Sequence, residues 1–186
     1  LMDLDILERR VPVTEENPEK SKRGLYKIKD NYLRFWFAFI YPHMSFIESG
    51  HSGIVMDKIR RGLTTSHIGF VYEDICQERM WELNVNNAWP FQFSQLGGYW
   101  DAKNEIDIAA LDPEGKNLIL GECKYWKDPV GLNVLHALEA KACDVAWERD
   151  RRKVWYVLFS ISGFSDELRN HAATRDDLLL IDDGER

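Results

Sequence analysis

Cysteine is scarce in this sequence of 186 residues, and the three cysteines present, Cys76, Cys123 and Cys143, form no CxxC pair. An odd number of widely spaced cysteines argues against a disulfide framework and against a zinc site. A reducing compartment, the cytoplasm, is therefore the expected location.

Long hydrophobic runs are missing as well. No stretch reaches the roughly 18 uninterrupted apolar residues of a membrane-spanning helix, because Arg34, Pro42 and His43 interrupt the nearest candidate, residues 31–46. We therefore expect no membrane association. The sequence has no signal peptide and opens on Leu1, as a fragment of a longer protein would. It has no GxxxxGK[ST] phosphate-binding loop, so this chain by itself should not hydrolyse ATP.

Positive charge is in short supply. Lys and Arg number 24 against 31 Asp and Glu, and the net charge is −7. This balance argues against a protein that coats nucleic acid by electrostatic attraction alone, although a local basic patch remains compatible with it. Two basic clusters, at residues 58–61 and 149–153, could follow a phosphate backbone, but a solvated surface is the favoured interpretation of both.

The first 65 residues predict a hairpin followed by helices. Residues 1–29 hold two short strand-like runs, ILERRVPV and GLYKIK, around a polar loop. Asp30 is a predicted N-cap for the aromatic run NYLRFWFAFIY, and Ser66 for a longer helix that follows. We expect the aromatic stripe to form part of the core.

From residue 89 the pattern changes to one typical of strands. The predicted strands are FQFSQLGGYW, EIDIAALD, NLILGECKYW, KVWYVLFSI and LLLID, with helices after the third and the fourth. With the helix that Ser66 is expected to begin, the order is helix, three strands, helix, strand, helix, strand. This order predicts an α/β fold with a mixed sheet flanked by helices.

The third strand carries two charges, Glu122 and Lys124, in an otherwise apolar run. The preceding segment DPEG, residues 112–115, predicts a turn, because Pro suits its second position and Gly its last. If that turn closes a hairpin, Asp107 falls opposite Glu122, with their Cβ atoms roughly 4.5–5.5 Å apart.

Lys124 has the same parity as Glu122 and is expected on the same face. Ala109, Leu111, Leu118 and Leu120 should share that face, with Ile106, Ile108, Ala110, Ile119, Gly121 and Cys123 on the other. Two carboxylates this close stay ionised together only with a cation between them, which indicates a site for a hard divalent metal. The alternative is a hairpin whose charged end lies in water.

Asp107, fourteen residues and then Glu122-Cys123-Lys124 resemble the D…(D/E)xK signature of the PD-(D/E)xK nuclease superfamily. The predicted element order is similar to its restriction-endonuclease-like αβββαβ core. Glu73, on the helix before the strands, resembles the glutamate on the first core helix of many members. The sequence departs from the pattern at Ile106, which stands in place of the proline.

A closer resemblance is to the C-terminal region of archaeal-type AAA+ ATPases, long filed as a domain of unknown function. It is carried by LERRVPVTE, KRGLYKIKDNYLRFWFAFIYP, IESG, EIDIAALD and GECKYW. The resemblance implies a winged-helix remnant with its wing at 1–29, a helical linker at 30–65 and a nuclease-like domain at 66–186. It also implies that an N-terminal ATPase module is absent from this chain.

The resemblance assigns roles to these residues. Asp107 and Glu122 would hold Mg²⁺ or Mn²⁺, with the Cys123 backbone carbonyl as a further ligand and Glu73 binding directly or through water. Lys124 would orient the attacking water or neutralise the phosphate. The implied activity is hydrolysis of DNA, with its form left open. The alternative function is a catalytically silent module for docking or homo-oligomerisation of the ATPase.

Overall fold

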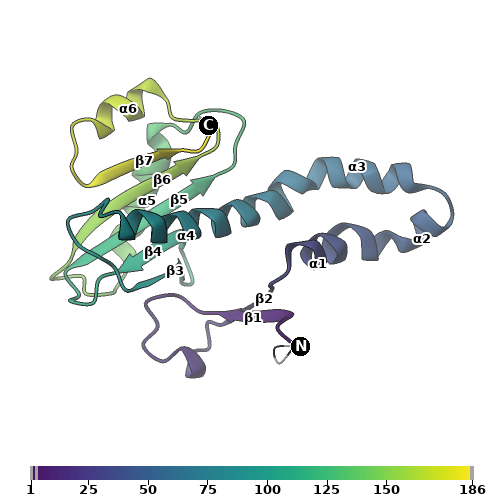
Figure 1. Cartoon of the computed structure of the whole chain (residues 1–186), viewed down its shortest axis with the longest axis horizontal. Coiled ribbons are helices and arrows are strands. Elements are labelled where there is room, and N and C mark those ends of the chain that lie inside the picture. The colour runs from purple at the N-terminus through teal and green to yellow at the C-terminus, as the bar shows by residue number, and fades with distance from the viewer. Residues whose placement is uncertain (1, 3, 185–186) are drawn as a thin grey trace. The chain divides into compact units, whose positions relative to one another are not determined.

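The structure is a computed structural model that describes residue 2 and residues 4–184 (Figure 1). The chain divides into two compact units. Unit 1 comprises Leu1–Arg10 and Gly24–Val71, and unit 2 comprises Val11–Arg23 and Tyr72–Arg186. In the described part of the chain, no helix is long and apolar enough to cross a membrane.

Unit 1 holds the predicted hairpin and most of the predicted helices. Strands β1 (Leu7–Arg10) and β2 (Leu25–Ile28) pair antiparallel. The helical segments after them are α1 (Asn31–Phe35), a π-helical turn (Trp36–Ile40), a 3-10 turn (Tyr41–His43), α2 (Met44–Glu48), α3 (Ser52–Leu63) and a second π-helical turn (Thr64–Ile68). The predicted N-cap is confirmed, because the Asp30 carboxylate accepts a hydrogen bond of 2.8 Å from the Leu33 N–H.

Two expectations for this region are wrong. The aromatic stripe is not core: Phe39 is its only fully buried member among the described residues, whereas Tyr32 and Tyr41 are exposed. Ser66 does not begin a helix, because helical backbone runs without a break from residue 52 to residue 85. The Ser66 hydroxyl instead donates 2.6 Å to the Gly62 carbonyl of the preceding turn, a local bond that serine makes inside helices as readily as it caps them.

Unit 2 contains the predicted mixed sheet. Helix α4 (Gly69–Val85) leads into β3 (Gln95–Trp100), β4 (Glu105–Leu111), β5 (Asn117–Lys124), α5 (Leu132–Asp144), β6 (Lys153–Ser160), α6 (Asp166–Ala172) and β7 (Leu178–Asp182). The strand order is β3-β4-β5-β6-β7, antiparallel as far as β5 and parallel beyond it. The predicted α/β fold class and the αβββαβ order are confirmed.

Helices cover both faces of this sheet (Figure 1). On one face, Leu135 and Leu138 of α5 and Leu168 of α6 pack against Leu118 and Leu120 of β5. On the other, α4 supplies the buried side chains of Tyr72, Cys76 and Met80, which join Ile108, Ala110, Ile119 and Val157. Strand β5 is therefore apolar on both sides until it reaches Glu122, as a central strand should be.

The connection between β1 and β2 packs with unit 2. It contains a 3-10 turn (Pro18–Lys20), the Val13 N–H donates 3.0 Å to the Gly98 carbonyl, and the Trp100 indole N–H donates 3.0 Å to the Arg23 carbonyl. The Val13 side chain also lies against the core on the α5 face. This loop thus extends the edge of the sheet beside β3.

The predicted register between β4 and β5 is confirmed. Ile108 pairs with Gly121 and Leu111 with Leu118. The turn closes as expected, since the Gly115 N–H donates 3.3 Å to the Asp112 carbonyl and Gly115 adopts a positive φ of 70°. The Asp112 carboxylate also accepts 3.0 Å from the Lys116 N–H. Local turn chemistry therefore sets the alignment of the two strands.

A β-bulge changes the expected faces next to the site. Between two regular pairs of the β3–β4 ladder, β3 contributes one residue, Gly98, where β4 contributes two, Asp107 and Ile108. The extra residue reverses the alternation, so Ile106 joins Tyr99 in the core on the α5 face instead of sharing the face of Ile108. The expected placement of Ile106 is thus wrong, because strict alternation assumes an unbroken ladder.

Gly121, one residue before Glu122, lies where three strands are packed closely. A Cβ atom at this position would lie 2.6 Å from Val157 Cγ1, 2.9 Å from the Val157 carbonyl oxygen and 3.2 Å from Ile108 Cβ. Because a backbone atom cannot yield as a flexible side chain does, we expect Gly121→Ala to lower the free energy of unfolding by about 1–3 kcal/mol in urea titrations.

Gly97→Ala is the matched control on β3. Its Cβ would meet Val13 Cβ at 3.4 Å, an ordinary van der Waals contact. We expect a change within about 1 kcal/mol of zero for this variant. Equal destabilisation by the two substitutions would contradict the close packing at Gly121.

Candidate active site

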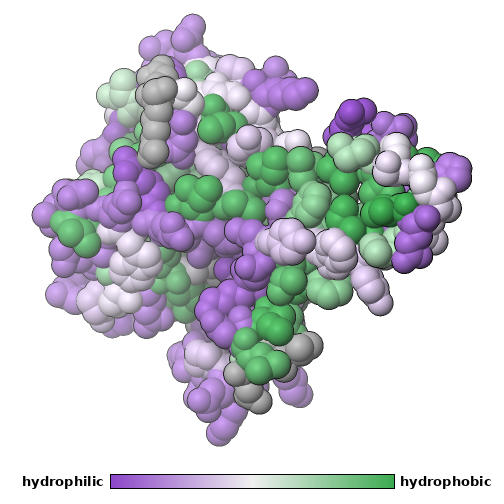
Figure 2. Space-filling model, turned by 45° about the vertical axis from the view of Figure 1, so that its right-hand side comes forward, coloured by the Kyte–Doolittle hydropathy of each residue, from purple (hydrophilic) through white to green (hydrophobic). Residues whose placement is uncertain are grey.

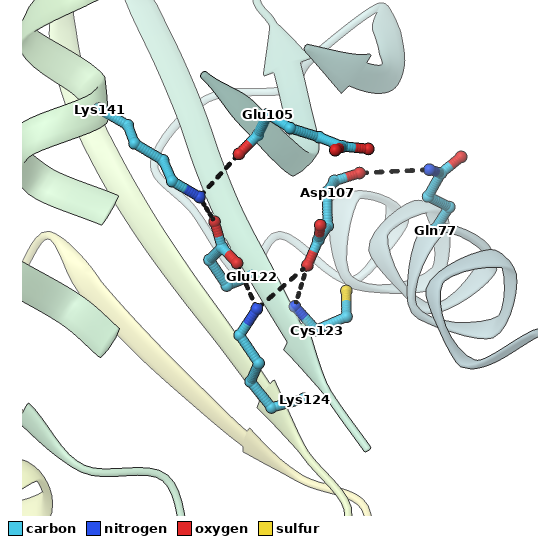
Figure 3. A network of polar contacts seen from close by, with 7 residues as sticks. All are labelled: Gln77, Glu105, Asp107, Glu122, Cys123, Lys124 and Lys141. Carbon is cyan, nitrogen blue, oxygen red and sulfur yellow. Dashed lines mark hydrogen bonds and ion pairs between the residues drawn. The ribbon is translucent and has the colours of Figure 1, made fainter. Parts of the chain in front are cut away.

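The site lies where β5 ends, and three elements supply its side chains (Figure 3). Glu122 and Lys124 come from β5, Asp107 from β4 and Lys141 from α5. The Glu122 side chain is only 6% exposed, and each of its oxygens meets an ammonium group: Oε2 lies 2.5 Å from Lys124 Nζ and Oε1 lies 2.6 Å from Lys141 Nζ. A buried carboxylate of this kind needs such partners to offset its loss of hydration.

Asp107 converges on the same point from the bulge of β4. Its Oδ2 atom accepts 2.8 Å from the backbone N–H of Cys123 and lies 3.7 Å from Lys124 Nζ. Its backbone carbonyl accepts 3.4 Å from the Gln77 side chain of α4. The Asp107 carboxylate thus accepts the hydrogen bond that a backbone carbonyl of β4 would accept from Cys123 in a regular ladder. The β4–β5 ladder therefore ends at the pair Ile108 and Gly121.

The hydrogen bond between the Cys123 N–H and Asp107 also determines where the Cys123 carbonyl points. The N–H and C=O of one strand residue point to the same neighbouring strand. Because the Cys123 N–H points to Asp107, the Cys123 carbonyl also faces the β4 side, where the ladder has ended. The next carbonyl, that of Lys124, points the other way and accepts 3.3 Å from the Ile161 N–H.

The surroundings of Asp107 oppose its ionisation. Burial, and then the charge of Glu122, raise the pKa of Asp107 to about 6, although Lys124 and the Cys123 N–H act in the opposite direction. Burial lowers the pKa of Lys124, but Asp107 and Glu122 outweigh it, and the net direction is upward. Lys124 is therefore held as an ammonium between two acids.

Lys141 is a site residue that the sequence reasoning missed. Besides Glu122, its ammonium donates 2.7 Å to the Glu105 carbonyl at the start of β4. One signal could have found it, because Lys141 follows Leu138 by three positions and precedes Val145 by four. It thus falls within the apolar stripe that faces the sheet, where a lysine is unusual.

Of the predicted site residues, Asp107, Glu122 and Lys124 come together, and the metal-binding role expected for Glu73 stays a prediction. Among the residues that the structure describes, no three His, Cys, Asp or Glu side chains gather into a group that could hold a metal ion. Glu73 is half-buried on α4. Burial raises the pKa of the Cys123 thiol most, followed by the nearby Cys76 thiol and the charge of Asp107, and the charge of Glu73 adds a smaller contribution.

The basic cluster at 149–153 does not serve this site. Lys153 pairs with Asn117 at the start of β5, seven residues before Lys124, or roughly 20 Å along the strand. Arg152 donates to the carbonyls of Ala142 and Val145 at the C-terminal end of α5. The favoured interpretation, a solvated surface, does not hold for Arg152, which is half-buried and caps backbone carbonyls instead.

Three comparisons place the chain among known proteins. It is 39% identical over 128 residues to the uncharacterized protein MJECL04 of Methanocaldococcus jannaschii, a match that covers 69% of this chain and 28% of the relative. The chain therefore spans under a third of that protein's length.

Two solved structures are similar in part. A repair endonuclease from Pyrococcus abyssi matches 55% of this chain and 44% of its own, at 12% identity and a TM-score of 0.36. An EndoMS–dsDNA2 complex matches 57% of this chain and 44% of its own, at 14% identity and a TM-score of 0.34. Similarity at this level says nothing about the activity of this chain.

A family model matches residues 36–143, more than half of the chain, and this range includes Asp107, Glu122, Lys124 and Lys141 of the site in Figure 3. The chain belongs to the DUF234 family, described as archaea bacterial proteins of unknown function.

Proposed function

We propose that this chain is a nuclease domain that hydrolyses phosphodiester bonds of DNA with the help of a divalent metal ion, Mg²⁺ or Mn²⁺. The observation that carries the proposal is the convergence of Asp107 and Glu122 in a buried place, with a raised pKa at Asp107. A carboxylate placed as Asp107 is does not serve stability, because its ionisation is opposed by its surroundings.

The donor set fits a hard divalent cation. The structure gives hydrogen-bond and ion-pair partners to Asp107 Oδ2, so within the described residues Oδ1 is available as a ligand. Glu122 Oε2 becomes available if Lys124 moves aside, and the Cys123 carbonyl faces the same space. Carboxylate and carbonyl oxygens are the ligands that Mg²⁺ prefers. When bound, the metal would supply an activated water and stabilise negative charge on the phosphate.

The two lysines have different parts in this proposal. Lys124, which lies between both acids, is free to turn toward a phosphate or water once a metal replaces it. The Lys141 ammonium donates to the Glu105 carbonyl and to Glu122 Oε1, so it holds the Glu122 carboxylate in place. The role expected for Glu73, binding the metal directly or through water, stays a prediction.

The chain's place in a larger protein is also a proposal. Its resemblance to the C-terminal region of archaeal-type AAA+ ATPases, and a relative more than three times the length of the matched segment, support an N-terminal ATPase module in the full-length protein. In that arrangement ATP hydrolysis would act on the DNA or on a partner, and this domain would cut.

A docking module is the second candidate function. It is favoured by the aliphatic and aromatic side chains exposed on the helical segments of unit 1, some of which form green surface in Figure 2. These side chains are those of Tyr32, Phe37, Tyr41, Phe46, Ile54 and Met56. Exposed apolar residues that form a contiguous patch often mark an interaction surface. If the site has no hydrolytic activity, docking or oligomerisation of the ATPase becomes the favoured function.

The nuclease proposal predicts the activity of three variants. Asp107→Asn and Lys124→Ala should each lower the rate of Mg²⁺-dependent DNA cleavage by at least about 100-fold, because each removes a charge that acts on the reacting phosphate or its metal. Lys116→Ala, which removes an exposed lysine at the 112–115 turn, is the control and should cleave as the wild type does. Equal cleavage by all four proteins would show that the activity, if any, lies elsewhere.

The electrostatics predict opposite effects of two conservative substitutions on stability without metal. The pKa of Asp107 is about 6 in the folded chain and about 4 when unfolded, so the folded state binds the proton more tightly. Its ionisation therefore lowers stability as the pH rises from about 4 to about 6, by about 3 kcal/mol. Asp107→Asn removes this loss and should melt several degrees higher at pH 8, but not at pH 4.

Glu122→Gln should instead melt lower at pH 8, because it leaves Lys124 and Lys141 facing a neutral amide. From the sequence alone the two carboxylates are equivalent; the second ammonium distinguishes them. Thermal melts in EDTA at both pH values make the comparison. A lower melting temperature for Asp107→Asn than for the wild type at pH 8 would contradict the conclusion that ionised Asp107 destabilises the folded chain.

A further inference from the structure

Trp126 ends the GECKYW motif, and the proposed hydrolysis makes no use of it. Its side chain is 48% exposed, although it stands two residues after Lys124. The Lys124 ammonium lies 5.6 Å from the centre of the indole ring, and the same ammonium contacts Glu122. About half of the surface of this large aromatic residue is therefore open to solvent beside the reacting groups.

The backbone that carries this ring is fixed. The Ser162 hydroxyl donates 2.5 Å to the Trp126 carbonyl. The loop closes at Val130, whose N–H donates 2.9 Å to the Gly163 carbonyl and whose carbonyl accepts 2.9 Å from the Ser165 N–H. Tyr125 turns to the opposite face, where its ring meets Tyr72 edge-on at 5.6 Å. The indole is thus presented by an anchored loop.

The charge around the ring suits a phosphate chain. Lys127 follows Trp126 and is exposed. The larger basic cluster lies at the far end of β5 and β6, so positive charge close to the site comes from Lys124, Lys127 and Lys141. An aromatic face beside lysines is the arrangement with which proteins bind single-stranded nucleic acid, the bases stacking and the phosphates meeting the cations.

We propose that Trp126 is a stacking platform for an unpaired base of the DNA strand, next to the phosphate that Asp107, Glu122 and Lys124 hydrolyse. The inference rests on the proposed function and names its substrate class. In a duplex both faces of an internal base are covered by its neighbours, so a platform of this kind favours a single strand or a locally unpaired nucleotide. Lys127 meets the adjoining phosphate.

Binding measured apart from cleavage tests the platform. Fluorescence anisotropy of a labelled single-stranded oligonucleotide, and of the same sequence as a duplex, is recorded with Ca²⁺ in place of Mg²⁺. We expect the wild type to bind the single strand more tightly than the duplex. Trp126→Ala should bind the single strand about 5- to 150-fold more weakly, the range for loss of one stacked base.

Matched variants separate stacking from bulk and from general surface effects. Trp126→Phe should keep most of the affinity, whereas Trp126→Leu, which has apolar bulk without an aromatic face, should behave as Trp126→Ala does. Trp81→Ala removes an indole that is 43% exposed on α4 and should bind the single strand as the wild type does. Circular dichroism melts establish that each variant is folded.

The platform is overturned if Trp126→Ala binds the single strand within about twofold of the wild type, if it weakens duplex binding equally, or if the wild type binds neither DNA. DNA cleavage with Mg²⁺ is measured separately for the wild type and Trp126→Ala. Tryptophan-dependent binding without cleavage would leave the platform standing and refute the nuclease proposal. Cleavage at the same rate by the wild type and Trp126→Ala would support the nuclease proposal and refute the platform.

Discussion

The burial of Glu122 between two ammonium groups is the constraint on which the rest of the site depends. The carboxylate stands near the end of a central strand that is apolar on both faces, where an unpaired charge would destabilise the fold strongly. Lys124 and Lys141 meet its two oxygens at 2.5 and 2.6 Å. With these partners Glu122 is held firmly, whereas Asp107 beside it keeps a raised pKa and a shortage of positive charge.

The fold brings these groups together by departing from regular structure at single points. The bulge of β4 sets Asp107 against the Cys123 N–H and ends the ladder, which turns the Cys123 carbonyl to the same side. Gly121 lets β4 and β6 approach β5 closely just before the site. Helix α5, packed on the sheet through its leucines, carries Lys141 to the far side of Glu122.

Much of this was predictable from the sequence, where local chemistry determines the outcome. The turn at 112–115 fixed the strand register, and that register placed Asp107, Glu122 and Lys124 together. The bulge was not predictable, because it depends on how β3 and the loop before it pair with β4. Lys141 was missed because its partners are distant in the sequence, although its place in the α5 stripe was a usable sign. The prediction that the aromatic run at 31–41 belongs to the core is wrong because burial preference says nothing about what is available to cover a helix.

Calorimetric titration with Mg²⁺ tests the central claim, that the acids of this site hold a metal, most directly. The account predicts saturable binding to the wild type at pH 7 that weakens below about pH 6, as Asp107 takes up a proton. Binding should be lost in Asp107→Asn and should be at least as tight in Lys124→Ala, which removes the cation that competes for the same oxygens. No saturable heat with the wild type, or the same affinity in Asp107→Asn, would contradict the account.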